Sequence, residues 1–352
     1  MPSLSAFLLV AFMFACGGGR TTTTTPLPPT TLRQAAAAHN INIGAAADSP
    51  YLGDASYAAI LGSEYSQLQT ENEMKFGIIH PGVSTYDFTG GDALVSFAQA
   101  HTMVVRGHTL VWHNQVPVWV TSGNYTSPQL STILQDHITT VARHYAGKVY
   151  AWDVVNEAFN DDGSMRDTIW YDQPGIGFAG TGTKYIEQVL NWAHAADPSA
   201  KLFYNDYNAE PVDAKSDAIY AMAQDFRTRG VPLDGIGFQL HIDLTFDNPA
   251  TLASLTSNLQ GFAALGLDLH ITELDIRLQD SSAASFNAQA KLYGEIATIW
   301  VQQPSCELFQ TWGFTDKYSW IPSFFPGQGW ALLWDANYQK KPAYGSVLNA
   351  LQ

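Results

Sequence analysis

Short apolar segments alternate with longer amphipathic segments along this chain from about residue 32 onward. Each short segment is bounded by turn residues and is typical of a buried strand in a parallel sheet, whereas the longer ones show helical spacing. The expected strands are 41–47, 67–71, 103–111, 149–156, 202–205, 235–240, 267–272 and 308–313. The clearest expected helices are 128–144, 183–196, 213–229 and 285–300, with N-caps at Ser127 and at either Ser281 or Ser282.

Eight strands with intervening helices predict one α/β domain, a single (β/α)8 TIM barrel that occupies residues 32–352. A doubly wound open sheet is the competing architecture. That fold would place a glycine-rich dinucleotide turn after its first strand, and the segment 44–47, Gly-Ala-Ala-Ala, lacks the required spacing. No internal repeat and no second domain are evident. Residues 321–330 are expected to form a long loop after the last strand.

The first residues have the features of an export signal. Residues 6–15 are an unbroken apolar run, too short to span a bilayer but long enough for the core of a signal peptide, which we place at 1–16. The segment 13–16, Met-Phe-Ala-Cys, loosely resembles a lipobox, so ordinary cleavage near residues 15–19 and lipidation of Cys16 with a membrane tether both stay open. Residues 17–31, rich in Gly, Thr and Pro, are expected to form a flexible linker. The chain is therefore expected to be exported, as a secreted protein or as a lipoprotein at the outer surface or in the periplasm.

The charge balance limits the partners that such a chain can have. There are 17 basic and 32 acidic residues, which give a formal net charge of −15. A surface of this kind has few cations to exchange for the counterions of a polyanion, so no nucleic-acid partner is expected. A neutral substrate is compatible with the charge. The 10 Trp, 16 Tyr and 18 Phe residues offer flat faces that suit sugar rings, although a barrel core also consumes aromatic residues.

Polar and titratable residues recur where the expected strands end. In a (β/α)8 barrel the carboxyl ends of the strands meet on one face, and the active site is built there. One polar strand end would be unremarkable, but a series of them that converge on one face points to a site. The residues concerned are Glu71, Asn72, Lys75, His108, Trp112, His113, Asn156, Glu157, Asn205, Asp206, Gln239, His241, Thr272, Glu273, Asp275 and Trp312.

Two of these residues, Glu157 and Glu273, follow the fourth and seventh expected strands and would face each other across the barrel mouth. Cleavage of a glycosidic bond needs two carboxyl groups, one to protonate the leaving oxygen and one to attack the anomeric carbon or activate water. The charge of one carboxylate raises the pKa of the other, which favours an acid and a base in the same site. Once the nucleophile is esterified, its charge is lost and the acid can act as a base.

Several segments of the chain resemble glycoside hydrolase family 10, the endo-β-1,4-xylanases. The two signature segments are 152–157, Trp-Asp-Val-Val-Asn-Glu, and 271–275, Ile-Thr-Glu-Leu-Asp. The resemblance covers nearly the whole chain from about residue 40, and the segments occur in the order of the family. The supporting segments are 71–75 (ENEMK), 107–113 (GHTLVWH), 204–207 (YNDY), 237–241 (GFQLH) and 312–317 (WGFTDK).

The resemblance implies a retaining double displacement on xylan and xylo-oligosaccharides without a cofactor. By this comparison Glu157 is the acid/base and Glu273 the nucleophile. Asn156 matches the residue that binds the 2-hydroxyl of the sugar being cleaved, a contact that strengthens in the transition state. His241 and Asp275 match a hydrogen-bonded pair that keeps the nucleophile ionised and oriented.

The same resemblance implies supporting and subsite residues. Gln239 is expected to help position the acid/base, and the faces of Trp312 and Trp320 are expected to leave little room for a hydroxymethyl group, which separates glucose from xylose. The residues implied in the subsites for the non-reducing side of the bond are Glu71, Asn72, Lys75, His108, Trp112, Trp312 and Trp320.

One feature departs from the family pattern. The family often carries a disulfide shortly before the last strand, but Trp300 stands where the first partner of Cys306 would be. The only other cysteine is Cys16, so no disulfide framework is expected and the stability of the chain must come from its core.

The same residues also bear on other functions. His108 and His113 are five positions apart, which is not a common metal-ligand spacing, so no metal site is expected. His270 is expected to be a hydrogen-bonded core residue.

A related glycanase acting on β-1,4-glucan or mannan, and a barrel that binds without catalysis, stay open as alternatives. A monomer is expected.

Overall fold

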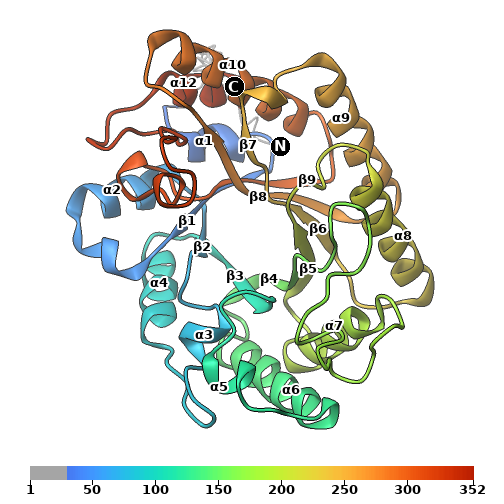
Figure 1. The fold of residues 1–352 in the computed structure, drawn as a ribbon. Helices are drawn as coiled ribbons and strands as arrows, with labels where there is room; N and C mark the ends of the chain where they lie inside the picture. The colour runs from blue at the N-terminus through green and yellow to red at the C-terminus, as the bar shows by residue number, and fades with distance from the viewer. Residues whose placement is uncertain (1–29) are drawn as a thin grey trace, which may run out of the picture.

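Residues 30–352 are described by a computed structural model and form a closed (β/α)8 barrel, with the helices arranged around a central ring of strands (Figure 1). The expected fold class is confirmed. The first helix begins at Leu32, where the side chain of Thr31 accepts from the backbone N–H of Gln34. The predicted signal peptide, Cys16 and all but the last residues of the predicted linker lie outside the described residues.

All strand pairs in the described sheet are parallel, and the pairings of β1 with β9 and of β6 with β8 close it into a barrel. The short strand β7 pairs with the far end of β8, so it continues the line of β6 after a two-residue interruption. The strands are β1 Asn42–Ala47, β2 Gln67–Thr70, β3 Val104–Val111, β4 Val149–Asn156, β5 Lys201–Asp206, β6 Gly235–Phe238, β7 His241–Asp243, β8 Asp268–Arg277 and β9 Cys306–Thr311.

The helices cover the outside of this ring (Figure 1). No helix among residues 30–352 is both long and apolar enough to cross a membrane. The α-helices are α1 Leu32–Ala37, α2 Ala55–Glu64, α3 Phe76–Ile79, α4 Thr89–Ala100, α5 Val118–Thr121, α6 Ser127–His144, α7 Lys184–Ala196, α8 Ala214–Arg229, α9 Pro249–Ala264, α10 Ala283–Val301, α11 Ile321–Phe324 and α12 Pro342–Ala350. Three 3-10 helices are η1 Ser49–Gly53, η2 Leu244–Phe246 and η3 Asp316–Tyr318.

The helix boundaries differ from the expected ones where a neighbouring residue makes the better cap. The predicted cap Ser127 of α6 is wrong, because Ser127 is already helical and Thr126 is the cap, with its backbone N–H donating to the Gln129 side chain at 2.9 Å. The cap at Ser282 is confirmed, since its hydroxyl accepts from the backbone N–H of Ser285. The expected loop 321–330 in fact opens with the short helix α11.

The missing disulfide leaves a buried thiol. Cys306 is free and buried at the start of β9, and burial raises the pKa of its thiol. Trp300 is also buried, at the end of α10.

The barrel interior is more polar than a run of apolar strands would suggest. Gln310 connects two neighbours from β2, accepting from Gln67 at 2.8 Å and donating to Gln69 at 2.9 Å. Arg106 and Asp153 form an ion pair whose two side chains have no exposed surface. Most of these buried polar atoms are paired, which offsets much of the cost of removing them from water, whereas Gln69 Nε2 has no hydrogen-bond partner among the described residues.

A glycine in β3 allows a fully buried tryptophan of β4 to approach its strand. A Cβ atom added to Gly107 would lie 2.2 Å from the ring of Trp152 in β4. Trp152 is completely buried, so its ring cannot move away into solvent. Glycine is therefore required at residue 107 for a steric reason.

We predict that Gly107→Ala destabilises the protein by about 1–3 kcal/mol, the usual cost of forcing an extra carbon into a filled core. Thermal unfolding of the purified variant would show a lower midpoint. Gly53→Ala is the matched control, because a Cβ there meets nothing within 4 Å, and it should leave the midpoint nearly unchanged. Equal midpoints for the two variants would contradict the packing argument.

Candidate active site

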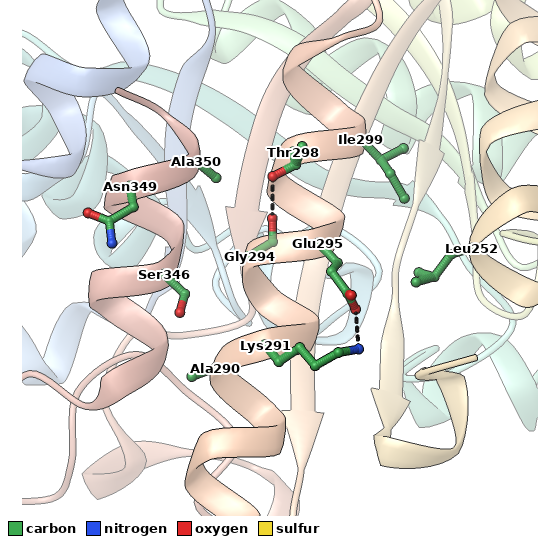
Figure 2. Close-up of a pocket in the computed structure, with 10 residues that line it drawn as sticks. All are labelled: Leu252, Ala290, Lys291, Gly294, Glu295, Thr298, Ile299, Ser346, Asn349 and Ala350. Carbon is green, nitrogen blue, oxygen red and sulfur yellow. Dashed lines mark hydrogen bonds and ion pairs between the residues drawn. The ribbon is translucent and has the colours of Figure 1, made fainter. Parts of the chain in front are cut away.

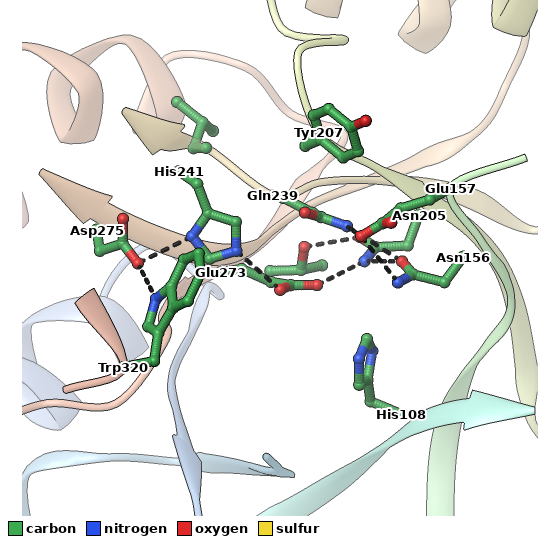
Figure 3. Close-up of polar contacts among 12 residues, drawn as sticks. His108, Asn156, Glu157, Asn205, Tyr207, Gln239, His241, Glu273, Asp275 and Trp320 are labelled. Atoms are coloured by element: carbon green, nitrogen blue, oxygen red, sulfur yellow. Dashed lines mark hydrogen bonds and ion pairs between the residues drawn. The ribbon is translucent and has the colours of Figure 1, made fainter. Parts of the chain in front are cut away.

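The structure gathers the predicted side chains at the carboxyl ends of the strands, and the two glutamates lie among them (Figure 3). Glu157 is the first residue after β4, and Glu273 lies within β8 where the register with β9 shifts. Each carboxylate has its own set of hydrogen-bond partners. The environments of the two groups therefore differ although both lie at the same mouth.

Glu273 is the more deeply buried of the two, with 5% of its side chain exposed against 11% for Glu157. One of its oxygens accepts from Asn205 Nδ2 at 2.7 Å, and the other lies 3.1 Å from His241 Nε2. Burial alone would raise the pKa of Glu273, but the hydrogen bond from His241 and the positive potential of His108 outweigh it and the pKa is lowered. Glu273 is therefore a carboxylate at neutral pH, as a nucleophile must be.

His241 is held between two carboxylates. Its Nδ1 lies 2.8 Å from Asp275 Oδ2, opposite the nitrogen that faces Glu273. Burial lowers the pKa of His241, but the charge of Asp275 and the hydrogen bonds to both carboxylates exceed that effect and raise it to about 10. At neutral pH both ring nitrogens carry protons and donate. The expected His241–Asp275 pair is present in this geometry.

Glu157 is presented by an unusual backbone conformation. Its φ is 60°, in the left-handed region that few non-glycine residues adopt, and its backbone N–H donates to Asn205 O at 2.9 Å. Trp112 Nε1 donates to one carboxylate oxygen at 2.8 Å, and Gln239 Nε2 donates to the other at 3.1 Å. These neutral donors orient the group and leave it partly open to the mouth.

An amide bridge connects the two carboxylates (Figure 3). Asn205 Nδ2 donates both to Glu273 and to Asn156 Oδ1, the latter at 2.9 Å, and Asn156 Nδ2 lies 3.3 Å from Glu157. With its amide turned over, Asn156 would instead accept from the Trp112 indole at 3.3 Å. In both orientations the Asn156 side chain lies beside the acid/base candidate.

A second polar cluster lies at the ends of β1 and β2. Lys75 Nζ donates to Asn72 at 3.1 Å and lies over the rings of Trp112 and Trp312 at 5.2 and 5.4 Å from their centroids. Burial, reinforced by neighbouring carboxylates, raises the pKa of Glu71 to about 8. Burial also lowers the pKa of Lys75, despite those carboxylates. The cluster can therefore donate and accept hydrogen bonds toward neutral hydroxyl groups.

Below the site lies the buried ion pair of Arg106 and Asp153 in the barrel interior. His108 Nδ1 lies 3.0 Å from Asp153 Oδ2, and its ring meets the Trp312 ring edge to face at 5.2 Å. Trp320 Nε1 donates to Asp275 at 2.8 Å, which places this indole beside the His241 ring. Hydrogen bonds and ring contacts thus connect most of the predicted site residues.

Two further residues hold the site together, and sequence reasoning missed one of them, Asp48. Asn205 is only a polar strand end in the sequence, yet it contacts both catalytic candidates through the bridge described above. Asp48, which directly follows β1, accepts from Asn72 Nδ2 with both oxygens at 3.2 Å. The signal for Asp48 was its place after the first strand, the same signal that identified the others. Asp206, another of the polar strand ends, is buried and pairs with Lys215 at 2.8 Å.

A groove on the outside of the barrel has different chemistry. It has a volume of about 560 Å³ and lies between α10 and α12, where Lys291, Glu295 and Ser346 line it (Figure 2). Its carboxylate, Glu295, is already paired with Lys291 at 2.8 Å. The groove therefore lacks the two separate carboxyl groups that glycosidic cleavage needs.

The sequence and the fold match known proteins over nearly their whole length. The sequence model of glycosyl hydrolase family 10 matches residues 31–350. Endo-1,4-beta-xylanase B of Thermotoga neapolitana is 44% identical over 318 residues, 89% of each chain. Endo-1,4-beta-xylanase C of Phanerodontia chrysosporium is 41% identical over 315 residues, which cover 88% of this chain and 76% of that protein.

Solved structures give the same result. The crystal structure of xylanase 10B from Thermotoga petrophila RKU-1 in complex with xylobiose is 42% identical and has a TM-score of 0.87, covering 93% of this chain and 98% of that one. Native xylanase 10B from Thermotoga maritima is 43% identical with a TM-score of 0.86, covering 91% and 98%. The similarity therefore extends over the whole barrel as well as the motifs.

We predict that His241→Asn shifts the acidic limb of the profile of kcat/KM against pH to higher pH. Without the imidazolium, burial dominates at Glu273, so its pKa should rise from below the ordinary 4.5 to above it. Loss of a hydrogen bond to a charged group, about 1.5–3 kcal/mol, should also lower kcat/KM about ten- to a hundredfold at the optimum. The measurement is kcat/KM against pH.

The control for this variant is His144→Asn, which removes a histidine that pairs with Asp92 at 2.8 Å on the outside of the barrel. It should leave the acidic limb in place. An unshifted limb in His241→Asn would show that His241 does not set the ionisation of Glu273.

Proposed function

Because the chain belongs to glycosyl hydrolase family 10, we propose that it is an endo-1,4-β-xylanase that hydrolyses internal bonds of xylan with retention, using Glu157 as the acid/base and Glu273 as the nucleophile. The observation that carries the assignment of roles is the difference between their partners. Glu273 faces the protonated His241 and is kept ionised. Glu157 has neutral donors and a more open position, as befits a group that exchanges protons with substrate and water.

In the first step Glu273 attacks the anomeric carbon and the bond to the leaving oxygen breaks while Glu157 transfers its proton to that oxygen. The product is a glycosyl ester on Glu273 and a shortened chain with a free hydroxyl. In the second step Glu157 removes a proton from water, which attacks the same carbon and releases Glu273. Two inversions give net retention.

The charges of the site change during this cycle. Esterification removes the negative charge of Glu273, which leaves His241 and Asp275 as a balanced pair beneath the sugar. The removal of a nearby negative charge lowers the tendency of Glu157 to hold a proton, so it becomes a base when water must be activated. Asn156 beside both groups is suited to bind the 2-hydroxyl as positive charge develops on the ring.

The cluster around Lys75 is suited to bind the sugars on the non-reducing side of the bond. Its amide, ammonium and carboxyl groups match neutral hydroxyls, and the indoles of Trp112 and Trp312 offer apolar faces. Trp312 and Trp320 enclose His241 from two sides. Their bulk favours xylose, which has no hydroxymethyl group.

We also propose that the enzyme acts outside the cell, since polymeric xylan is too large to cross a membrane. We propose that it acts there as a monomer. The apolar run 6–15 supports export. Lipidation of Cys16 remains the alternative to ordinary cleavage, and the mass of the mature N-terminal peptide distinguishes the two.

We predict that Glu157→Ala and Glu273→Ala each lower turnover of xylan by at least about a thousandfold, the scale of losing an acid/base or a nucleophile. Added azide should restore turnover of an activated aryl xyloside in both variants. The product should be the β-azide with Glu157→Ala, where azide attacks the ester intermediate. It should be the α-azide with Glu273→Ala, where azide attacks the substrate directly. Proton NMR identifies each anomer.

The matched control is Glu295→Ala, a carboxylate on the outer groove, which should retain normal turnover. In the unmodified enzyme, NMR of fresh products should show the β-anomer first. Early α-anomer would overturn retention. Activity confined to carboxymethyl cellulose or mannan in a panel with soluble xylan would overturn the proposed substrate.

A further inference from the structure

The segment that connects β6 to β7, beside Glu273, has an irregular backbone at Leu240. Phe238 in β6 pairs with Ile271, and His241 in β7 pairs with Asp275, so three steps along this strand match four steps along β8. The extra residue lies in β8, whose register with β9 also shifts between Ile271 and Leu274. On the facing segment between β6 and β7, Leu240 has a φ of 58°, in the left-handed region that is unfavourable for a leucine. This conformation persists only if the surrounding structure holds it.

The residues on either side of Leu240 serve the two different carboxylates. Gln239 Nε2 donates to Glu157 at 3.1 Å, and His241 Nε2 donates to Glu273 at 3.1 Å. Figure 3 shows both side chains entering the site from this short segment. The backbone conformation at Leu240 therefore fixes the directions of both donors together.

A buried carboxylate holds this conformation. The backbone N–H of Leu240 donates to Glu210 Oε1 at 2.8 Å. Glu210 lies between β5 and α8 and is 2% exposed. Its backbone carbonyl accepts from Asn258 Nδ2 at 3.0 Å. Burial raises the pKa of Glu210, opposed by the Leu240 hydrogen bond and by Lys215 and His241. The backbone of Glu210 is thus anchored to α9, and its carboxylate accepts from the irregular turn.

We propose that Glu210 is a positioning residue for hydrolysis, which holds the left-handed turn at Leu240 and thereby aims Gln239 at Glu157 and His241 at Glu273. The inference rests on the proposed roles of the two glutamates. Removal of the acceptor would leave the Leu240 N–H buried without a partner, and the turn would relax toward an ordinary strand. Relaxation would rotate both donors away from their carboxylates at once.

The test compares Glu210→Ala with Glu210→Gln, whose amide oxygen can still accept from Leu240. For Glu210→Ala we expect kcat on xylan to fall about tenfold or more with a smaller change in KM, since the two weakened hydrogen bonds act on the reacting groups. The acidic limb of kcat/KM should move to higher pH. The pKa of His241, about 10 before the change, should fall when followed by NMR of the imidazole. Glu210→Gln should stay within about threefold of the unmodified enzyme.

A second variant tests the backbone argument directly. Glycine adopts the left-handed conformation without a steric cost, so adding Leu240→Gly to Glu210→Ala should recover part of the lost kcat per folded molecule. No recovery, together with a normal His241 titration in Glu210→Ala, would overturn the proposal.

The structural control is Glu64→Ala. Glu64 is also a buried carboxylate that accepts a backbone N–H, from Leu32 at 2.9 Å, but it lies between α1, α2 and α12, away from the mouth. The Glu64→Ala variant should have a lower unfolding midpoint, but the acidic limb of its kcat/KM and the pKa of its His241 should stay unchanged. If Glu210→Ala behaves like Glu64→Ala, its role is only structural. If the unmodified enzyme does not act on xylan, the proposed function fails instead, and the NMR titration still tests the positioning.

Discussion

Closure of a wholly parallel sheet is the constraint on which the rest of this structure depends. Because β1 pairs with β9 and β6 pairs with β8, the strands that form the ring have neighbours on both sides and end on the same rim. Residues far apart in the chain, such as Glu157 and Glu273, are brought together by this geometry alone. The loops then need only to orient side chains that the barrel has already placed.

Burial beneath that rim explains why the site is built from networks of polar groups. A carboxylate removed from water needs several compensating donors, and Glu273 has Asn205 and His241. His241 in turn needs Asp275, and His108 needs the Asp153–Arg106 pair in the barrel interior. The ionisation state of Glu273 is therefore set by groups that extend well below the mouth.

The order of elements could be predicted from the sequence because burial on both faces leaves a strong apolar signal in most strands. β2 was a weaker case, since Gln67 and Gln69 face a polar interior. The two glutamates proposed as the catalytic pair, and most of the side chains around them, could be predicted from their positions at or near expected strand ends and from motifs. Asn205 was expected at the site only as a polar strand end, and Glu210 was not expected there at all. Their roles depend on which atoms they face: one bridges two strands, and the other meets a backbone N–H distant in the chain. The left-handed backbone at Leu240 also has no signature in the residue type.

The indole of Trp320 connects the wall of the mouth to the nucleophile. Its N–H donates to Asp275 Oδ2, the oxygen that also faces His241, at 2.8 Å in both cases. The position of the segment around α11 and the orientation of Glu273 are therefore thermodynamically linked. A sugar that packs on Trp320 and holds it in place also favours the hydrogen bonds that connect Trp320 through Asp275 and His241 to Glu273. The linkage is reciprocal. Binding energy from a ring remote from the scissile bond can in this way raise kcat instead of only lowering KM.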